Sequence, residues 1–222
     1  MKDPSAGNLL VASTLIDTPT VARSVCLLVH RQDDAVIGVM LNRPMQTPPG
    51  LLDGLFDSDE KSSQARFRLP DSDTELPADS EECNDQSLIV PSASALPSTE
   101  NAPPIHFGGP LSGPLVAIHA EADHAETETG RGIFVTAQKD NLQQLIRDAD
   151  RPYRLMIGHL GWHPDQLQRE IDEGWWHVLP ASADSVFSDN AEMWPRLVRR
   201  ATAGSMAKWM QIPDDERAHE LN

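Results

Sequence analysis

Apolar runs near the start of the sequence predict two strands of a β-sheet. The first spans Val21 to His30 and holds five consecutive apolar residues, as expected of a strand that is covered on both faces. The second spans Ala35 to Leu41, and its β-branched residues favour the same structure. Because only a short polar turn separates the two runs, they predict an antiparallel hairpin. Pro44 then ends the second strand, since proline cannot donate to a sheet.

The later part of the sequence predicts a mixture of strands and helices. Strands are expected at residues 115–119, 132–136 and 153–158, with a polar connection at 121–131. Between the last two strands, apolar residues from Leu142 to Ala149 follow the i, i+3, i+4, i+7 spacing of an amphipathic helix.

Two further helices are expected towards the C-terminus. The first begins at Pro164, which suits a first helical turn, and stops at Gly174. The second is capped by Asn190 and ends at Gly204. Pro195 should lie near its first turn, because an interior proline costs about 3 kcal/mol.

Residues 51–104 have the composition of a surface insert. They hold twelve acidic residues, three basic residues and six prolines. From Asp71 to Gln86 the only large aliphatic residue is Leu76, so this stretch cannot bury enough apolar surface to offset its ordering entropy. We therefore expect a long, mobile insert, with one short helix at 51–56, within a single domain that spans residues 1–222.

Charge and cysteine usage narrow the class of protein. The 222-residue chain carries a net charge of -16, which repels nucleic-acid phosphates and anionic membrane surfaces. No apolar run approaches the ~20 residues of a membrane span, and the N-terminus lacks a signal-peptide pattern. Cys26 lies in an apolar run and Cys83 in an acidic stretch, so we expect no disulfide and a cytoplasmic protein. One basic cluster remains, interpreted as a solvated helix face: Arg196, Arg199, Arg200 and Lys208.

Several short segments, taken in order, form a more specific pattern. They are residues 7–12 (GNLLVA) with 23–25 (RSV), 38–44 (GVMLNRP), 107–111 (FGGPL), and 158–162 (GHLGW) with Gln166, Leu167 and Glu170, followed by Trp176 and Phe187. Each segment alone is weak, but four in the right order are fairly specific. Over residues 7–45 and 105–205 the chain resembles the AlgH/YqgE family of bacterial proteins.

The resemblance implies an α+β fold with a central barrel-like β-sheet, mixed or antiparallel, flanked by helices. It implies little about activity, because family members are labelled transcriptional regulators while their biochemical role is not established. The sequence departs from the family at Thr14, Thr18, Val21, His159 and Asp165, where Pro, Asp, an aromatic residue, Tyr and Gly are usual. If the family's site uses the opening Pro or Asp, this chain has altered it.

Three loops carry the candidate binding residues. Asn42 can close a turn through its backbone neighbours, whereas Arg43 could present its guanidinium to a carboxylate or phosphate. Gly108 and Gly109, before Pro110, form either a tight turn or an anion cradle of backbone N–H groups. They are not a P-loop, because no helix with Lys and Ser/Thr follows them. The third loop contributes His159, Gly161 and Trp162.

No catalytic or metal-binding motif stands out. The sequence lacks a G-x-S-x-G elbow, and Gly161 and Pro164 prevent His159 and His163 from forming a helical metal pair. His106 and His119 could meet His159 in space, although a zinc site needs three or four convergent ligands, and the acidic loop around His119 and His124 could bind a divalent cation weakly. We therefore predict no resident metal and no cofactor.

Two functional hypotheses follow. The first is a non-catalytic regulatory or protein-interaction protein, because no catalytic constellation is found and five tryptophans lie in the C-terminal third, where they form either core or a partner surface. The alternative is a small-molecule, nucleotide or anion binding protein or hydrolase. It requires Asn42, Arg43, Gly109 and His159 to converge. A protein partner is compatible with either hypothesis, direct nucleic-acid binding is not expected, and the oligomeric state is left open.

Overall fold

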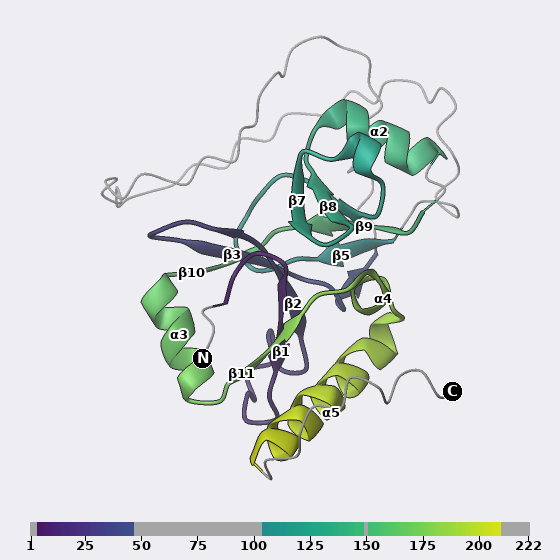
Figure 1. The fold of residues 1–222 in the computed structure, drawn as a ribbon. Coiled ribbons are helices and arrows are strands. Elements are labelled where there is room, and N and C mark those ends of the chain that lie inside the picture. Colours follow the sequence, from purple (N-terminus) through teal and green to yellow (C-terminus); the bar gives the residue numbers. More distant parts are fainter. Residues whose placement is uncertain (1–3, 47–103, 149–150, 210–222) are drawn as a thin grey trace, which may run out of the picture.

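The computed structural model describes residues 4–46, 104–148 and 151–209. Its eleven described strands form two sheets (Figure 1). The first sheet is wholly antiparallel, in the order β10-β3-β2-β1-β11. Its members are β1 (Asn8–Ala12), β2 (Val25–Arg31), β3 (Val36–Met40), β10 (Leu160–Trp162) and β11 (Trp176–Pro180). The predicted hairpin is confirmed as β2–β3. Its first strand starts later than predicted, because residues 21–23 form a turn.

The second sheet has the order β4-β5-β9-β6-β8-β7 and is mixed, since β5 and β9 run parallel. Its members are β4 (Pro44–Met45), β5 (Ile105–Phe107), β6 (Val116–His119), β7 (Thr127–Gly130), β8 (Ile133–Thr136) and β9 (Tyr153–Ile157). The segment predicted as a polar connection folds into the 3-10 helix η2 (Ala122–His124) and β7. The α+β class is confirmed. The described strands form two sheets without a closed ring, so the barrel-like detail is not confirmed.

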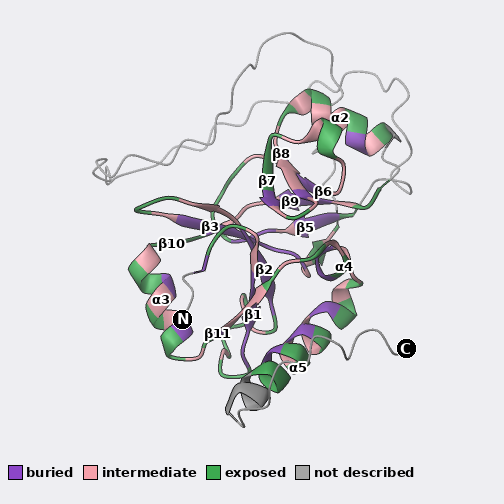
Figure 2. Ribbon diagram, viewed as in Figure 1, coloured by how far each residue is buried: buried purple, intermediate pink, exposed green. Residues whose placement is uncertain are grey.

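The central strands β1, β2 and β3 of the first sheet are mostly buried on both faces, which explains the continuous apolar run in β2 (Figure 2). Alternate residues such as Leu9, Val11 and Leu27 pack towards Met156 of the second sheet and Leu197 of α5. Their neighbours on the opposite face of the sheet pack against α3. Figure 1 shows α3 and α5 on opposite sides of the first sheet. A third cluster joins the second sheet to α2.

Four α-helices are described: α2 (Lys139–Asp148), α3 (Pro164–Asp172), α4 (Ala183–Val186) and α5 (Asn190–Trp209). The predicted bounds of α3 are confirmed, because His163 caps its first turn and Gly174 follows it at a φ of 79°. The predicted bounds of α5 are partly wrong. Asp189 provides the cap through its carboxylate, Pro195 lies inside the helix, and the helix continues past Gly204.

The structure tests only part of what was expected of the cysteines and of the insert. Cys26 is buried and unpaired, as expected, whereas Cys83 and nearly all of the 51–104 insert lie outside the described residues. Within the described ranges, no helix combines the length and the apolar character needed to cross a membrane.

Candidate functional site

The two glycine-containing loops at 108–111 and 158–161 lie directly against each other. Leu111 and His159 exchange backbone hydrogen bonds of 3.1 and 3.0 Å. A Cβ on Gly109 would come within 2.2 Å of the His159 backbone, so the loops can meet only because this residue has no side chain. The N–H of Gly108 is bonded to the Ile157 carbonyl at 2.7 Å, and it is therefore committed to the fold and does not face an anion. Burial lowers the pKa of His159, which favours its neutral form.

Asn42 and Arg43 are directed elsewhere, towards the segment before β2. The Asn42 side chain accepts from the N–H of Val25 at 3.0 Å and donates to the carbonyl of Arg23 at 2.9 Å. The Arg43 guanidinium donates to the Ala22 carbonyl. The structure thus brings Gly109 and His159 together, while the side chains of Asn42 and Arg43 brace a different loop.

That braced loop, residues 13–24, borders a cavity of about 290 Å³. Its lining is contributed by the loop and by one residue of α5: Ser13, Thr14, Ile16, Asp17, Ala22, Arg23 and Trp194. The loop is anchored at its start, where Ser13 N–H donates to the Trp175 carbonyl at 2.8 Å. It is anchored at its end by Asn42 and Arg43. Both anchors come from the sheet and its connections, so the cavity has a rigid frame.

Arg23 has the most unusual backbone conformation at this site. Its φ of 57° makes it the one non-glycine residue with a positive φ in the described part of the chain, and such values are uncommon for side chains of this kind. The Asn42 bond to its carbonyl helps to hold that conformation. Its guanidinium lies 5.7 Å from the Trp194 ring centroid, within the range of a cation–π contact. Trp194 is itself fixed by a 2.8 Å bond from its indole N–H to the Ala12 carbonyl.

Two large apolar side chains are exposed next to the cavity. Leu15 is 70% exposed and lies between the lining residues Thr14 and Ile16. Trp175 is 44% exposed, and the Gly174 that precedes it lies beside Leu15. Exposed apolar residues that adjoin a cavity are typical of surfaces that bind a partner.

Trp162, the tryptophan among the predicted binding residues, lies in the core. Trp162 is buried and packs edge-on against Trp176, with ring centroids 6.1 Å apart. Both indole N–H groups donate to one carboxylate oxygen of Glu170, at 3.1 and 2.8 Å. This arrangement joins α3 to the two edge strands β10 and β11, which explains why two of the five tryptophans lie in the core.

Sequence reasoning missed a buried polar cluster around Arg154 of β9. Its guanidinium donates to the Val186 carbonyl at 2.8 Å, to Asn190 Oδ1 at 2.5 Å and to the Ser188 carbonyl. It also contacts His106 Nε2 at 2.8 Å, and because arginine only donates, that nitrogen accepts and the imidazole is neutral. Burial, and then the neighbouring guanidinium, lower the pKa of His106. An arginine within the apolar run of a central strand was the signal for this cluster.

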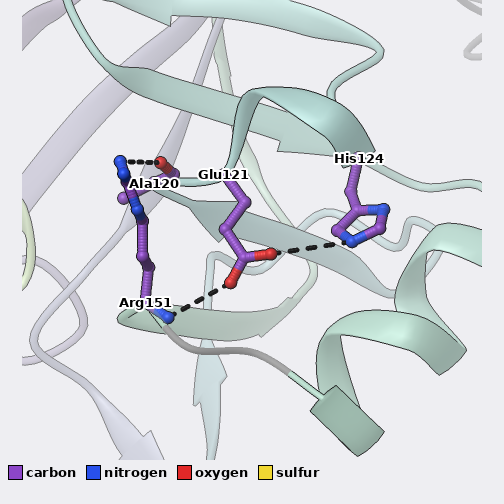
Figure 3. Close-up of polar contacts among 4 residues, drawn as sticks. All are labelled: Ala120, Glu121, His124 and Arg151. Carbon is purple, nitrogen blue, oxygen red and sulfur yellow. Dashed lines mark hydrogen bonds and ion pairs between the residues drawn. The ribbon is translucent and has the colours of Figure 1, made fainter.

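A second polar cluster closes the turn after β6, as Figure 3 shows. The Glu121 carboxylate accepts from the backbone N–H of Arg151 at 3.1 Å and lies 3.6 Å from His124 Nε2. The Arg151 guanidinium reaches the Ala120 carbonyl at 3.4 Å. Among residues 4–46, 104–148 and 151–209, no three metal-ligating side chains come together in a group that could hold a metal ion, the side chains of this loop included.

Comparisons with known proteins agree with this architecture. A family model described as AlgH-like matches residues 9–205. A UPF0301 protein of Thermobifida fusca is 31% identical over 211 residues, covering 94% of this chain and 92% of the relative. A UPF0301 protein of Chlorobaculum tepidum is 27% identical over 201 residues, covering 87% and 84%.

Two solved structures share the fold. The solution structure of the AlgH protein from Pseudomonas aeruginosa has a TM-score of 0.60 at 17% identity, covering 95% of this chain and 97% of that one. The crystal structure of protein DIP2367 from Corynebacterium diphtheriae has a TM-score of 0.60 at 19% identity, covering 90% and 88%. With the family match over most of its length, the chain belongs to the AlgH-like family.

Proposed function

We propose that this protein is a non-catalytic interaction protein and that the cavity beside the 13–24 loop receives a partner protein. The observation that carries the proposal is the combination of a framed cavity with exposed Leu15 and Trp175 beside it. Tryptophan is enriched among the few residues that supply most of the binding energy of protein interfaces, and Leu15 adds exposed apolar surface beside it. A regulatory role, of the kind that the family's label suggests, would act through this partner.

The chemistry of the lining supports binding over catalysis. Two lining side chains, Ser13 and Thr14, carry a hydroxyl that could act as a nucleophile, and the Ser13 hydroxyl accepts from the N–H of Leu15 at 3.3 Å. Among the lining residues there is no histidine or cysteine, and Asp17 is the single carboxylate. A serine nucleophile needs an adjacent base, and a carboxylate pair needs a second acid.

The alternative site, at the predicted loops, receives less support. Asn42 and Arg43 direct their side chains to the backbone of residues 22–25, whereas Gly109 and His159 are joined to each other by close backbone packing. An enzyme or anion-binding site that uses all four residues would require their polar groups to meet at one point. We therefore interpret Asn42 and Arg43 as supports of the 13–24 loop.

Site-specific photo-crosslinking in the native host tests the proposed function. A photoreactive phenylalanine analogue is placed at Leu15 or at Trp175, with Leu111 as the matched control. Leu111 is also exposed, at 47%, but it pairs with His159 beside β10, at the opposite edge of the first sheet from β11. We expect one adduct of defined mass from both Leu15 and Trp175 and none from Leu111. Equal labelling at all three positions, or none, would contradict the proposal.

A further inference from the structure

The cavity presents a cation, Arg23, which is an exposed residue and whose guanidinium is not used to bind another residue in the described part of the protein. There, the Arg23 guanidinium makes no hydrogen bond or ion pair, and its contact is with the face of Trp194. A guanidinium that lies over a ring keeps its in-plane N–H donors available, and these match the two oxygens of a carboxylate. Asn42 and Arg43 hold the backbone from which Arg23 projects, and the contact with Trp194 orients the guanidinium itself.

An anionic side chain lines the same cavity. Asp17 likewise has no hydrogen bond or ion pair to any residue in the described ranges. A phosphate, with its higher charge, would be repelled by Asp17 more strongly than a single carboxylate would. A ligand that pairs a carboxylate with a nearby N–H donor satisfies both Arg23 and Asp17.

The size and the apolar surface of the cavity narrow the class of ligand that it can hold. At about 290 Å³ it lies at the small end of ligand sites, which suits one amino-acid residue better than a nucleotide. Ile16, Ala22 and Trp194 provide an apolar wall. Outside the cavity, Leu15 and Trp175 offer apolar contact to whatever chain leads into it.

We propose that the cavity binds the C-terminal residue of a partner polypeptide. The terminal carboxylate binds Arg23, the N–H of that residue faces Asp17, and an apolar terminal side chain packs against Ile16, Ala22 and Trp194. The inference rests on the proposed interaction function and adds the chemistry that the partner must present.

Titration of the full chain with short peptides, followed by NMR, tests this inference. The probes are acetyl-Ala-Ala-Leu with a free carboxylate, the same peptide amidated, and amidated acetyl-Ala-Asp-Ala, whose one carboxylate is internal. The reporters are the indole N–H of Trp194 and the amide of Arg23. We expect saturable shifts with the free-acid peptide, and binding weaker by about tenfold or more for the amidated leucine peptide, since a charge-assisted bond is lost. The aspartate peptide should also bind more weakly, because its carboxylate is not at the chain end.

Variants separate the role of Arg23 from a general charge effect. Arg23→Gln should weaken binding of the free-acid peptide by about tenfold or more. Arg131→Gln removes the same charge from an exposed turn and should leave binding unchanged. An unaltered NMR spectrum away from the loop would verify that Arg23→Gln is folded.

Each contrary outcome overturns the inference in a distinguishable way. Equal binding of the amidated leucine peptide would exclude recognition of a terminal carboxylate, and preference for the aspartate peptide would assign the cavity to an internal acidic segment. If no peptide binds but the crosslinked partner at Leu15 persists, the inference fails while the interaction function stands. If neither is observed, both fail.

Discussion

Replacement of Arg154 by methionine should produce a large loss of stability, because this side chain holds several elements together. It lies in β9, is 8% exposed, and donates to acceptors after β3, in β5 and around α4 and α5. Methionine fills a similar volume but offers no donor. Three buried acceptors, on Leu41, His106 and Val186, would lose their partner.

The expected magnitude follows from those three acceptors. A buried acceptor that is left without a partner costs about 1–3 kcal/mol. Water can reach the acceptors on Ser188 and Asn190, which are only partly buried, so they add little. The free energy of unfolding of Arg154→Met should therefore fall by about 3 kcal/mol or more. With a urea dependence near 2 kcal/mol per molar, the unfolding midpoint should drop by roughly 1.5 M.

Urea unfolding followed by circular dichroism measures this shift, and Arg151→Met is the matched control. Arg151 lies three residues earlier, and its guanidinium makes one long bond to an exposed carbonyl, so its replacement should cost less than about 0.5 kcal/mol. The reasoning is refuted if the two variants unfold at the same urea concentration. If Arg154→Met does not accumulate in folded form, Arg154→Lys gives the graded test. A lysine variant as stable as the wild type would contradict the argument, because one ammonium group cannot reach all of these acceptors.

Three further predictions concern other buried groups. Glu170→Gln should lower the free energy of unfolding by about 1–3 kcal/mol, because Trp162 and Trp176 both donate to this carboxylate. The control Glu173→Gln, at an exposed position, should change the free energy of unfolding little, and equal urea midpoints for the two variants would contradict the prediction. Burial lowers the folded-state pKa values of four histidines: His106, His119, His159 and His177. The stability that their neutral forms provide is therefore present above the ordinary pKa near 6.5 and is lost as the pH falls through the folded-state pKa values. Melting temperatures should decline from pH 7.5 to 5, more steeply in the wild type than in His177→Gln, and a flat profile would refute the assignment. Burial raises the pKa of Cys26 to about 12, so a Cys83→Ser variant should react with a thiol reagent only after unfolding, and rapid labelling of the native protein would show that Cys26 is accessible.

The elements that could be predicted from the sequence are those with a strong local pattern. The run in β2 shows burial on both faces directly, and Pro164 and Gly174 delimit α3 because each has a distinct backbone preference. The strands β10 and β11 were missed because they have only three and five residues, which carry too little periodicity. Pro195 was expected near the first turn because a propensity argument ignores tertiary packing, which here holds Met193 and Leu197 in the core on either side of it.

The candidate site was harder to predict because its parts are distant in sequence. Trp194 borders the cavity only because its indole bonds to Ala12, 182 residues earlier in the chain. No local pattern marks Arg23 as a residue with a positive φ. The motif that does stand out in the sequence, Asn42-Arg43, marks the support of the loop and not the lining of the cavity.

This separation of support from lining means that a change in the lining of the cavity need not alter the fold. Three of the segments that match the family pattern make contacts to the backbone that fix the strands and the loop ends: residues 38–44, 107–111 and 158–162. Thr14, one of the positions at which this chain departs from the family pattern, lines the cavity instead. A substitution at Thr14 changes the cavity without disturbing the frame, whereas a substitution at Asn42 releases Arg23 from its unusual conformation. For the proposed binding function, the ligand is therefore to be inferred from the lining of the cavity and not from family membership.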